Sequence, residues 1–508
     1  MDDGTGNLEQ FLAAVIQLVG TENVQTEQMI VADYGKHSLP MPDRIPGAVV
    51  LPGSTEEVQE IVRLANEYRV PLFPISAGWN LGLGRRAPLR SGQVVLDLGR
   101  RMDRIIEIDE ELGYCVVQPG VTFAQMHEEL ERRGSTLAIS PTSGPPLGSL
   151  LGNALDKGGG AGLNGSHFEN LCGMEVVLGN GEIIRTGEGG LDTEVHPNWH
   201  VTKFSFGPAL DGIFSQSNYG VVTLAGMWLG RRPPHARSLF FAFDDDADFA
   251  EIVDISRRLK NANAIPSMVR VTNDLYLLAS QSLSPKYRPG SGRKSLTLEE
   301  REELRAKYGL GAWNVATVLH GQNDAALQPS IEAIKSHFLK SGKGRYISQE
   351  EAESIAPLST ALDINQLRPA GQELNMLEWR TGGAIWFTPG MPMRAKAAQQ
   401  CVDESREACE RNDIDYMVSF VCGARFARGV HALMYNRDEE GEARAADACY
   451  REMSDVYRNR GIFVGRAPTE YQSYHQQFRT DAVKQTCDAI KSVLDPNGVI
   501  APGRYGIG

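Results

Sequence analysis

The chain has 508 residues, of which 42% are hydrophobic and 23% charged, and its net charge at pH 7 is −13. This length exceeds the size at which one hydrophobic core stops growing and predicts two or more domains, while the negative charge argues against a nucleic-acid partner, because such affinity comes largely from Lys and Arg at phosphates. The seven cysteines show no CxxC spacing, which argues against a disulfide framework or a zinc ribbon and predicts a reducing, cytoplasmic compartment.

The first predicted unit is a βαβ arrangement near the N-terminus. A strand is expected at 48–51, a helix with a capping box at 54–57 follows it, and a second strand occupies 72–75. The glycine-rich segment 74–84, PISAGWNLGLG, leaves this second strand. Small residues let a backbone come close to a phosphate and aim its N–H groups at it. An ordinary surface turn is the alternative interpretation.

After the glycine-rich segment, the chain contains several short apolar segments rich in β-branched residues, which are typical of strands. Strands are predicted at 93–98, 105–109, 114–118, 174–178, 182–185 and 220–229. The sequence Gly179-Asn180-Gly181 predicts a tight hairpin, and Thr122 with Gln125 predicts a second capping box. Residues 143–165 are dense in glycine, which favours wrapping a ligand over regular structure. The GxGxxG match at 160–165 follows a helical stretch rather than a strand, so it does not indicate a Rossmann fold.

The second half of the chain alternates helices with strands, and the proline-rich segment 230–234 predicts the domain boundary. Helices are expected at 8–19, 249–260, 298–307, 331–339, 393–412 and 443–460, with a strand at 461–464.

The chain lacks a Walker lysine, a zincin histidine pair and a GxSxG elbow, which argues against a P-loop, a metal site and a hydrolase. No apolar run is long enough to span a bilayer, so no membrane association is expected.

Several motifs follow one another in order from about residue 45 to the C-terminus. They are 74–84, 117–122, 151–154, 172–178, 207–218 and the ending 501–504. Together they resemble the vanillyl-alcohol oxidase / 4-cresol methylhydroxylase family of FAD enzymes. The resemblance implies an α+β fold with a PCMH-type FAD-binding domain of two α/β subdomains and an α+β cap domain. It places the FAD-binding domain at 1–233, the cap at 234–460 and a returning C-terminal segment at 461–508.

The resemblance also implies which residues hold FAD. The pyrophosphate cradle would consist of Pro74, Ile75, Ser76, Ala77, Gly78, Trp79, Asn80, Leu81 and Gly82. The remaining contacts would come from Ser143, Gly144, Gly148, Ser149, Gly152, Asn153, Gly158, Gly159, Ala161, Gly162, Gly220, Val221, Val222 and Arg504. Because loop N–H groups supply the anion site, no Walker lysine is required.

Family members oxidise the benzylic carbon of para-substituted phenols by hydride transfer to flavin N5, which gives a quinone methide. Two tyrosines and an arginine in the family hold the phenolate, whose charge assists hydride departure. The resemblance therefore implies a small aromatic substrate, oxygen or a cytochrome-like electron acceptor, and a homodimer or a multiple of dimers.

This sequence departs from the family around the expected substrate. Arg466 matches the family's arginine, with a salt-bridged surface arginine as the alternative, but the neighbouring tyrosine position holds Gly465. Relatives carry a histidine pair that aligns with Ala427 or Arg428 and with Gly429, so Arg428 and Arg425 could join Arg466 in facing the substrate. The planar guanidinium groups of arginine suit carboxylates as well as phenolates. The aspartate that relatives place near flavin N5 falls near Gly144.

The positions at which relatives tether FAD covalently hold Leu377 and Ala384. Neither side chain can form such a bond, so FAD is expected to be bound non-covalently.

Four further residues are candidates for the chemistry. Tyr34 and His37 lie where the family contributes a phenol-binding tyrosine, with packed loop residues as the alternative. Glu373 and Glu378 are candidates for acid/base work, with buried ion pairs to Arg380 or Arg368 as the alternative.

Three functional hypotheses follow from these residues. The first is an FAD-dependent oxidase or dehydrogenase of a para-substituted phenol or related aromatic compound. The second is a flavin oxidoreductase for a carboxylated, non-phenolic substrate. The third is a flavin-binding subunit that lacks its own chemistry.

Overall fold

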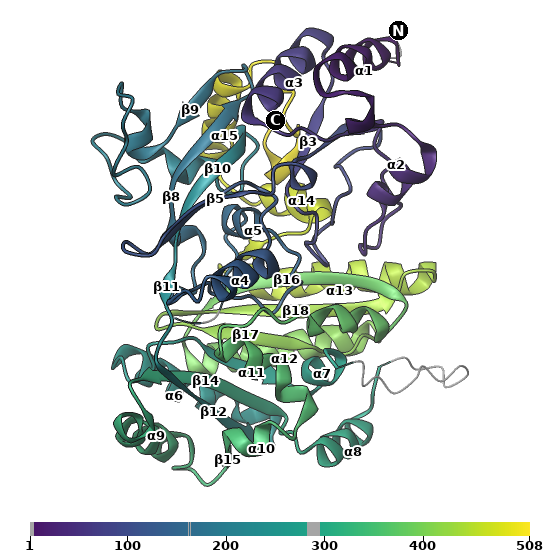
Figure 1. Cartoon of the computed structure of the whole chain (residues 1–508). Coiled ribbons are helices and arrows are strands. Elements are labelled where there is room, and N and C mark those ends of the chain that lie inside the picture. The colour runs from purple at the N-terminus through teal and green to yellow at the C-terminus, as the bar shows by residue number, and fades with distance from the viewer. Residues whose placement is uncertain (1–4, 161, 163, 282–294) are drawn as a thin grey trace.

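The computed structural model describes residues 5–160, 162, 164–281 and 295–508. The chain forms two lobes, one that carries both termini and one built around a large sheet from the middle of the chain (Figure 1). Helices and strands are mixed throughout, so the expected α+β class is confirmed.

The first sheet forms the core of the N-terminal lobe. Its order is β1 (Val24–Gln25), β2 (Ala48–Val50), β4 (Val94–Asp97) and β3 (Leu72–Ile75), and β2, β4 and β3 are parallel. Between β2 and β3 lies α3 (Thr55–Tyr68), which buries Val58, Ile61, Val62 and Ala65. The Ser54 side chain accepts a hydrogen bond from the N–H of Glu57, as the capping box predicts, while the Glu57 carboxylate reaches back to the N–H of Gly53. Helix α1 (Thr5–Val19) packs on α3, and α2 (Gln28–Gly35) follows.

The second sheet of this lobe is antiparallel. Its order is β5 (Ile105–Asp109), β6 (Tyr114–Val117), β10 (Gly220–Trp228), β8 (Leu171–Leu178) and β9 (Ile183–Arg185). The hairpin expected at Gly179-Asn180-Gly181 joins β8 to β9. Helices α4 (Phe123–Arg132), α5 (Leu150–Leu155) and α15 (Asp481–Leu494) share its apolar core. A small ribbon of β7 (Leu137–Ala138) and β11 (Gly230–Arg231) lies beside it.

The C-terminal end of the chain returns to the N-terminal lobe. The N–H of Leu72 in β3 donates to the carbonyl of Val499, and Leu72 forms a parallel bridge with Ile500. Helix α14 (Gln472–Gln476) precedes α15 in this returning segment. The lobe is therefore assembled from both ends of the sequence, with the cap domain between them.

The cap domain is built on an eight-stranded antiparallel sheet. Its order is β15 (Gly344–Ile347), β12 (His235–Phe243), β14 (Trp313–Gly321), β13 (Val269–Asn273), β17 (Val418–Cys422), β18 (Phe426–Asn436), β16 (Gly382–Pro392) and β19 (Val464–Arg466). The strand expected at 461–464 is wrong, because pairing with β16 shifts it to 464–466. The sheet of the cap thus continues past residue 460.

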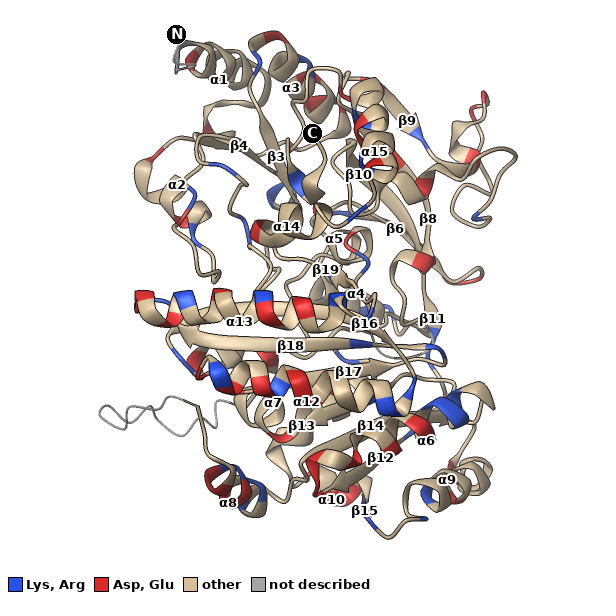
Figure 2. Ribbon diagram, turned by 180° about the vertical axis from the view of Figure 1, so that it is seen from behind, with Lys and Arg blue, Asp and Glu red and all other residues tan. Residues whose placement is uncertain are grey.

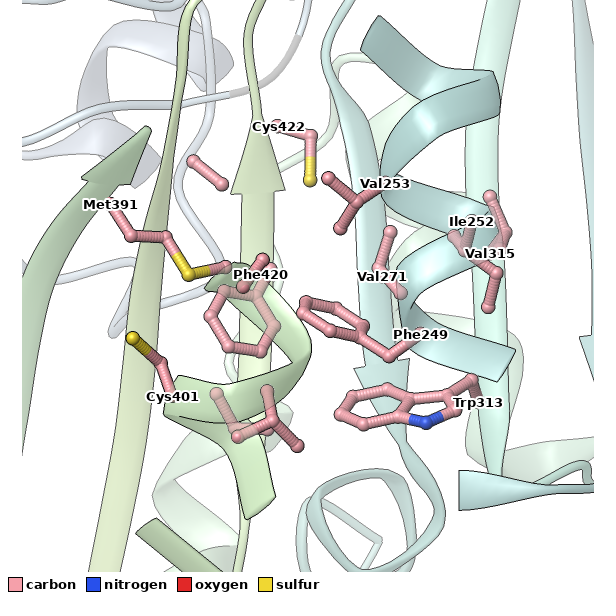
Figure 3. Packing of buried hydrophobic residues seen from close by; sticks show 14 of the residues in the cluster. Phe249, Ile252, Val253, Val271, Trp313, Val315, Met391, Cys401, Phe420 and Cys422 are labelled. Atoms are coloured by element: carbon pink, nitrogen blue, oxygen red, sulfur yellow. The ribbon is translucent and has the colours of Figure 1, made fainter. Parts of the chain in front are cut away.

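The two faces of this sheet differ. One face packs against α6 (Phe249–Asn261), α9 (Asp324–Phe338), α12 (Ala395–Arg411) and α13 (Glu440–Arg458). Figure 3 shows this core, in which Phe249 and Phe420 meet with ring centroids 4.7 Å apart beside Val271 and Trp313. The helix expected at 331–339 begins earlier, at Asp324, because Asn323 caps its first turn.

The opposite face of the cap sheet supports the shorter helices and the N-terminal lobe. Helices α7 (Asp274–Ala279), α8 (Leu298–Tyr308), α10 (Gln349–Ala352) and α11 (Ser359–Asn365) contribute to its apolar cluster. Leu81 and Leu83, from the glycine-rich loop, join the same cluster. The cavity described below lies on this face.

Charged residues of both signs alternate along the outer sides of α12 and α13 (Figure 2). None of the helices in the described part of the chain has the length and apolarity to cross a membrane. The seven cysteines are free thiols, and six of them are buried.

Candidate active site

A large cavity separates the N-terminal lobe from the cap sheet and encloses about 2810 Å³, its open mouth included. Glycine-rich loops form one wall, and side chains of the cap strands form the other. Such a large concave site with a few convergent polar groups is the expected place for a ligand.

The loop after β3 forms the first part of the wall. Gly78 and Gly82 have φ of +69° and +66°, a region that side chains with a Cβ rarely adopt. The carbonyl of Gly82 accepts a hydrogen bond from the N–H of Trp386, 3.1 Å away, which ties the loop to strand β16. The predicted residues Pro74, Ile75, Ser76, Gly78, Trp79, Asn80 and Leu81 line the cavity, whereas Ala77 and Gly82 do not.

The glycine-dense region forms the second part of the wall. The Ser149 hydroxyl caps α5 by accepting from the N–H of Gly152. A Cβ on Gly152 would lie 2.3 Å from the Ser76 hydroxyl, so the two loops approach each other closely at this glycine. The predicted residues that line the cavity here are Ser143, Gly144, Gly148, Ser149, Gly152, Asn153, Gly158, Gly159, Gly220, Val221, Val222 and Arg504. Gly162 does not line it, and Ala161 lies outside the described residues.

Buried polar atoms along this wall test whether FAD fits. The Asn80 Oδ1 and Arg504 Nε atoms are buried without a hydrogen-bond partner, although such atoms are normally satisfied. The Arg85 guanidinium also lines the cavity, and burial, followed by repulsion from Arg86, lowers its pKa. An unsatisfied acceptor on Asn80, an unsatisfied donor on Arg504, the cations Arg85 and Arg504, and close-approaching glycines fit an elongated polar ligand with a pyrophosphate, as FAD has.

Arg466 enters the cavity from β19 of the cap. Its Nε and Nη2 atoms lie 2.8 and 2.6 Å from Oδ2 of Asp156, at the end of α5. The Tyr505 hydroxyl donates to the other oxygen of Asp156 over 3.2 Å. Arg466 is thus a partly exposed, ion-paired residue within the cavity, held from the N-terminal lobe.

Arg428 lies beside Arg466 and projects from β18. It donates from Nη1 to the carbonyl of Lys157 at 2.7 Å, and burial together with repulsion from Arg466 lowers its pKa. An ideal Cβ on Gly465 would lie 3.5 Å from Arg428 Nε. The guanidinium of Arg428 therefore occupies the space next to the position at which relatives carry a tyrosine.

A tyrosine nevertheless reaches the cavity from another element. The Tyr276 hydroxyl in α7 donates to Oε1 of Glu373 at 2.7 Å, and both residues line the cavity. Burial, followed by the Glu373 carboxylate, raises the pKa of Tyr276 well above its usual value, so the phenol stays protonated. The sequence contains no local signal for Tyr276, because tertiary packing alone brings α7 to Glu373.

Three candidates for catalysis do not reach the cavity. Tyr34 donates to Oδ2 of Asp97, the last residue of β4, over 2.6 Å. His37 accepts at Nδ1 from the N–H of Leu39, and burial lowers its pKa to about 4. Glu378 is exposed to solvent. Tyr34 and His37 therefore have hydrogen-bond partners within the fold, and none of the three residues lines the cavity.

Other expected contacts also differ. Glu373 forms no ion pair with the two arginines proposed for it, since Arg380 pairs with Asp415 and Arg368 pairs with Asp363. Arg425 is exposed and does not line the cavity.

The comparisons with known proteins agree with this geometry. Residues 46–187 match the FAD binding domain family, and residues 232–505 match the C-terminal domain of FAD linked oxidases. The chain is 34% identical over 496 residues to the 4-cresol dehydrogenase [hydroxylating] flavoprotein subunit of Pseudomonas putida, a match that covers 96% of this chain and 94% of the relative. The chain belongs to the vanillyl-alcohol oxidase / 4-cresol methylhydroxylase family. It is an FAD-dependent oxidoreductase, and FAD is its cofactor.

Solved structures of family members superpose closely on this one. A p-cresol methylhydroxylase with substrate bound is 33% identical, with a TM-score of 0.95 over 99% of this chain and 97% of that one. The 4-ethylphenol oxidase of Gulosibacter chungangensis is 28% identical, with a TM-score of 0.94 over 99% and 98%. A third family relative, the 1'-carboxy-chondrochloren decarboxylase of Chondromyces crocatus, is 32% identical over 99% of this chain and 98% of its own length.

Proposed function

We propose that the protein oxidises the benzylic carbon of a para-substituted phenol or related aromatic compound by hydride transfer, through a quinone-methide type intermediate. The observation that carries this proposal is the entry of Arg428 and Arg466 into the same cavity that the glycine loops line. Apolar side chains from the cap, including Trp386, Val421 and Phe426, complete the wall around the two arginines. This combination suits a flat aromatic ring that carries one negative charge.

The protein's own residues supply binding and electrostatics. FAD, when bound, supplies the hydride acceptor at N5. Arg466 stabilises the substrate phenolate, whose charge favours loss of the hydride. Glu373, hydrogen-bonded to Tyr276 through Oε1, is positioned in the cavity wall to accept a proton from the substrate or from water.

A carboxylated substrate is the second candidate function. The guanidinium groups of arginine bind carboxylates as readily as phenolates, and the decarboxylase of Chondromyces crocatus is, by its name, an enzyme that acts on a carboxylated compound.

The similarity to a flavoprotein subunit supports a separate electron acceptor, either oxygen or a cytochrome-like partner. A dimer or a multiple of dimers remains part of the proposal.

Anaerobic flavin bleaching tests the proposal directly. We expect 4-alkylphenols or vanillyl alcohols to remove the absorbance of the bound flavin in the visible range. Bleaching by carboxylated analogues alone would overturn the phenolic assignment in favour of the second candidate. The absence of bleaching by any small aromatic compound would instead support a flavin-binding subunit without its own chemistry.

A further inference from the structure

Two arginines of the cap sheet lie in register across three neighbouring strands. Arg270 in β13 pairs with Val421 in β17, and Val421 pairs in turn with Arg428 in β18. Residues directly opposite each other in antiparallel strands place their side chains on the same face. With strands about 4.8 Å apart, the Cα atoms of the two arginines are separated by about 10 Å, with Val421 between them.

The shared face is the one that lines the cavity. Arg270, Val421 and Arg428 all line it, whereas the alternating residues Val271 and Phe420 point into the opposite core (Figure 3). A small adjoining recess shares Arg270, Tyr276 and Glu373 with the cavity as lining residues. Guanidinium groups on side chains of this length can therefore converge above Val421.

Neither arginine is paired with a carboxylate. The Arg428 side chain donates to the carbonyl of Lys157, and the Arg270 side chain makes no hydrogen bond or ion pair with any residue that the structure describes. By contrast, Arg466 is held by Asp156. The carboxylate of Glu373, in the same cavity, accepts the hydrogen bond of Tyr276.

Unpaired cations in a partly buried site carry a desolvation cost that an anionic ligand offsets. One carboxylate can accept hydrogen bonds from both guanidinium groups at once, because each of its oxygens has two lone pairs. Val421 and Met268, which also line the cavity, offer apolar surface to the part of the ligand that carries the carboxylate.

We propose that Arg270 and Arg428 clamp the carboxylate of an aromatic acid, which makes acids the preferred substrate class. This inference rests on the proposed function, because it assumes that the cavity accepts an aromatic substrate beside FAD. It adds Arg270, to which no motif of the sequence points, as a residue that determines specificity.

Binding of non-reacting probes to the FAD-loaded protein tests the clamp. The probes are 4-hydroxybenzoate and 4-hydroxycinnamate, each compared with its neutral amide, and neither acid has a saturated benzylic carbon to oxidise. Calorimetry is expected to give a Kd at least about tenfold lower for an acid than for its amide. Arg270→Gln and Arg428→Gln should each remove most of this preference, and Arg270→Lys should retain part of it.

Arg425→Gln is the matched control, because Arg425 is an exposed arginine three residues from Arg428 and outside the cavity. It should leave the preference for acids unchanged. Equal binding of acids and amides by the unaltered protein would overturn the clamp, as would a preference that survives in Arg270→Gln. Displacement of the acids by millimolar inorganic phosphate with matching affinity would show a general anion site and would overturn the assignment to a carboxylate.

These outcomes are separable from those of the proposed function. If the clamp is wrong, neutral 4-alkylphenols still bleach the flavin. If benzylic oxidation is wrong, the non-reacting acids still bind in preference to their amides. Thermal melting and FAD content of each variant verify that it is folded and loaded.

Discussion

Replacement of Arg466 by methionine is expected to lower kcat/KM for a phenolic substrate by about 10²- to 10³-fold, which is typical for the loss of one donor that stabilises a developing anion. Methionine keeps much of the length of the side chain but removes the charge and all donors. The folded state should also lose stability, because Asp156 keeps only its hydrogen bond from Tyr505. With side chains about one-fifth exposed, the pair contributes less than a fully buried one.

Asp156→Asn separates the two effects of the Arg466 variant. The single carbonyl oxygen of asparagine can still accept from Arg466, and its NH2 group can donate to the Tyr505 hydroxyl, but asparagine no longer neutralises the guanidinium. We expect kcat/KM for a phenol to stay near the wild-type value or to rise, since Arg466 is freer to face the substrate. The double variant Arg466→Met/Asp156→Asn should be more stable than Arg466→Met alone, because it buries no unpaired carboxylate. Its kcat/KM for a phenol should stay as low as that of Arg466→Met. An Arg466→Met enzyme that carries FAD and retains kcat/KM within a few-fold of the wild type would contradict the role assigned to Arg466.

Replacement of Gly160 by alanine is expected to abolish retention of FAD. Its Cβ would lie 2.5 and 2.6 Å from the carbonyl oxygens of Ser140 and Pro141 and 2.7 Å from Nε2 of His167. Two of these atoms belong to the backbone, so the loop cannot relieve the contacts without moving away from the cavity wall.

Gly212→Ala is the control for this variant, because Gly212 does not line the cavity and a Cβ there would meet nothing within 4 Å. FAD is measured in the supernatant after acid precipitation. The Gly212→Ala protein should release the same amount of FAD as the wild type, and Gly160→Ala should release almost none. Full FAD content in Gly160→Ala would refute the close-packing argument, and yellow colour left in the wild-type pellet would refute non-covalent binding.

Local signals in the sequence predicted the parts of the fold that local chemistry determines. Ser54 caps α3 and the Asn-Gly turn joins β8 to β9, because a hydroxyl acceptor and a left-handed glycine act within a few residues. The glycine loop at 74–84 could also be predicted from local sequence, because its glycines directly follow a short parallel strand. Most of the residues expected to hold FAD consequently line the cavity.

The substrate side was harder to predict, because strand register and lobe docking determine it. Arg270 faces the cavity through pairing between β13 and β17, which no local pattern reveals. Tyr276 meets Glu373 across 97 residues of sequence, and Asp156 meets Arg466 across 310. Conversely, the family resemblance points to Tyr34 and His37 as substrate contacts, but in the fold their side chains hydrogen-bond with Asp97 and Leu39.

The most direct test of the account is the rate of anaerobic flavin reduction with a 4-alkylphenol that carries deuterium at its benzylic carbon. Transfer of the benzylic hydride predicts slower reduction than with the unlabelled compound, and deuterium on the aromatic ring should have no such effect. Equal rates for the benzylic-labelled and unlabelled compounds would mean that breaking this bond does not limit flavin reduction, and dependence on the ring label alone would contradict oxidation at the benzylic carbon.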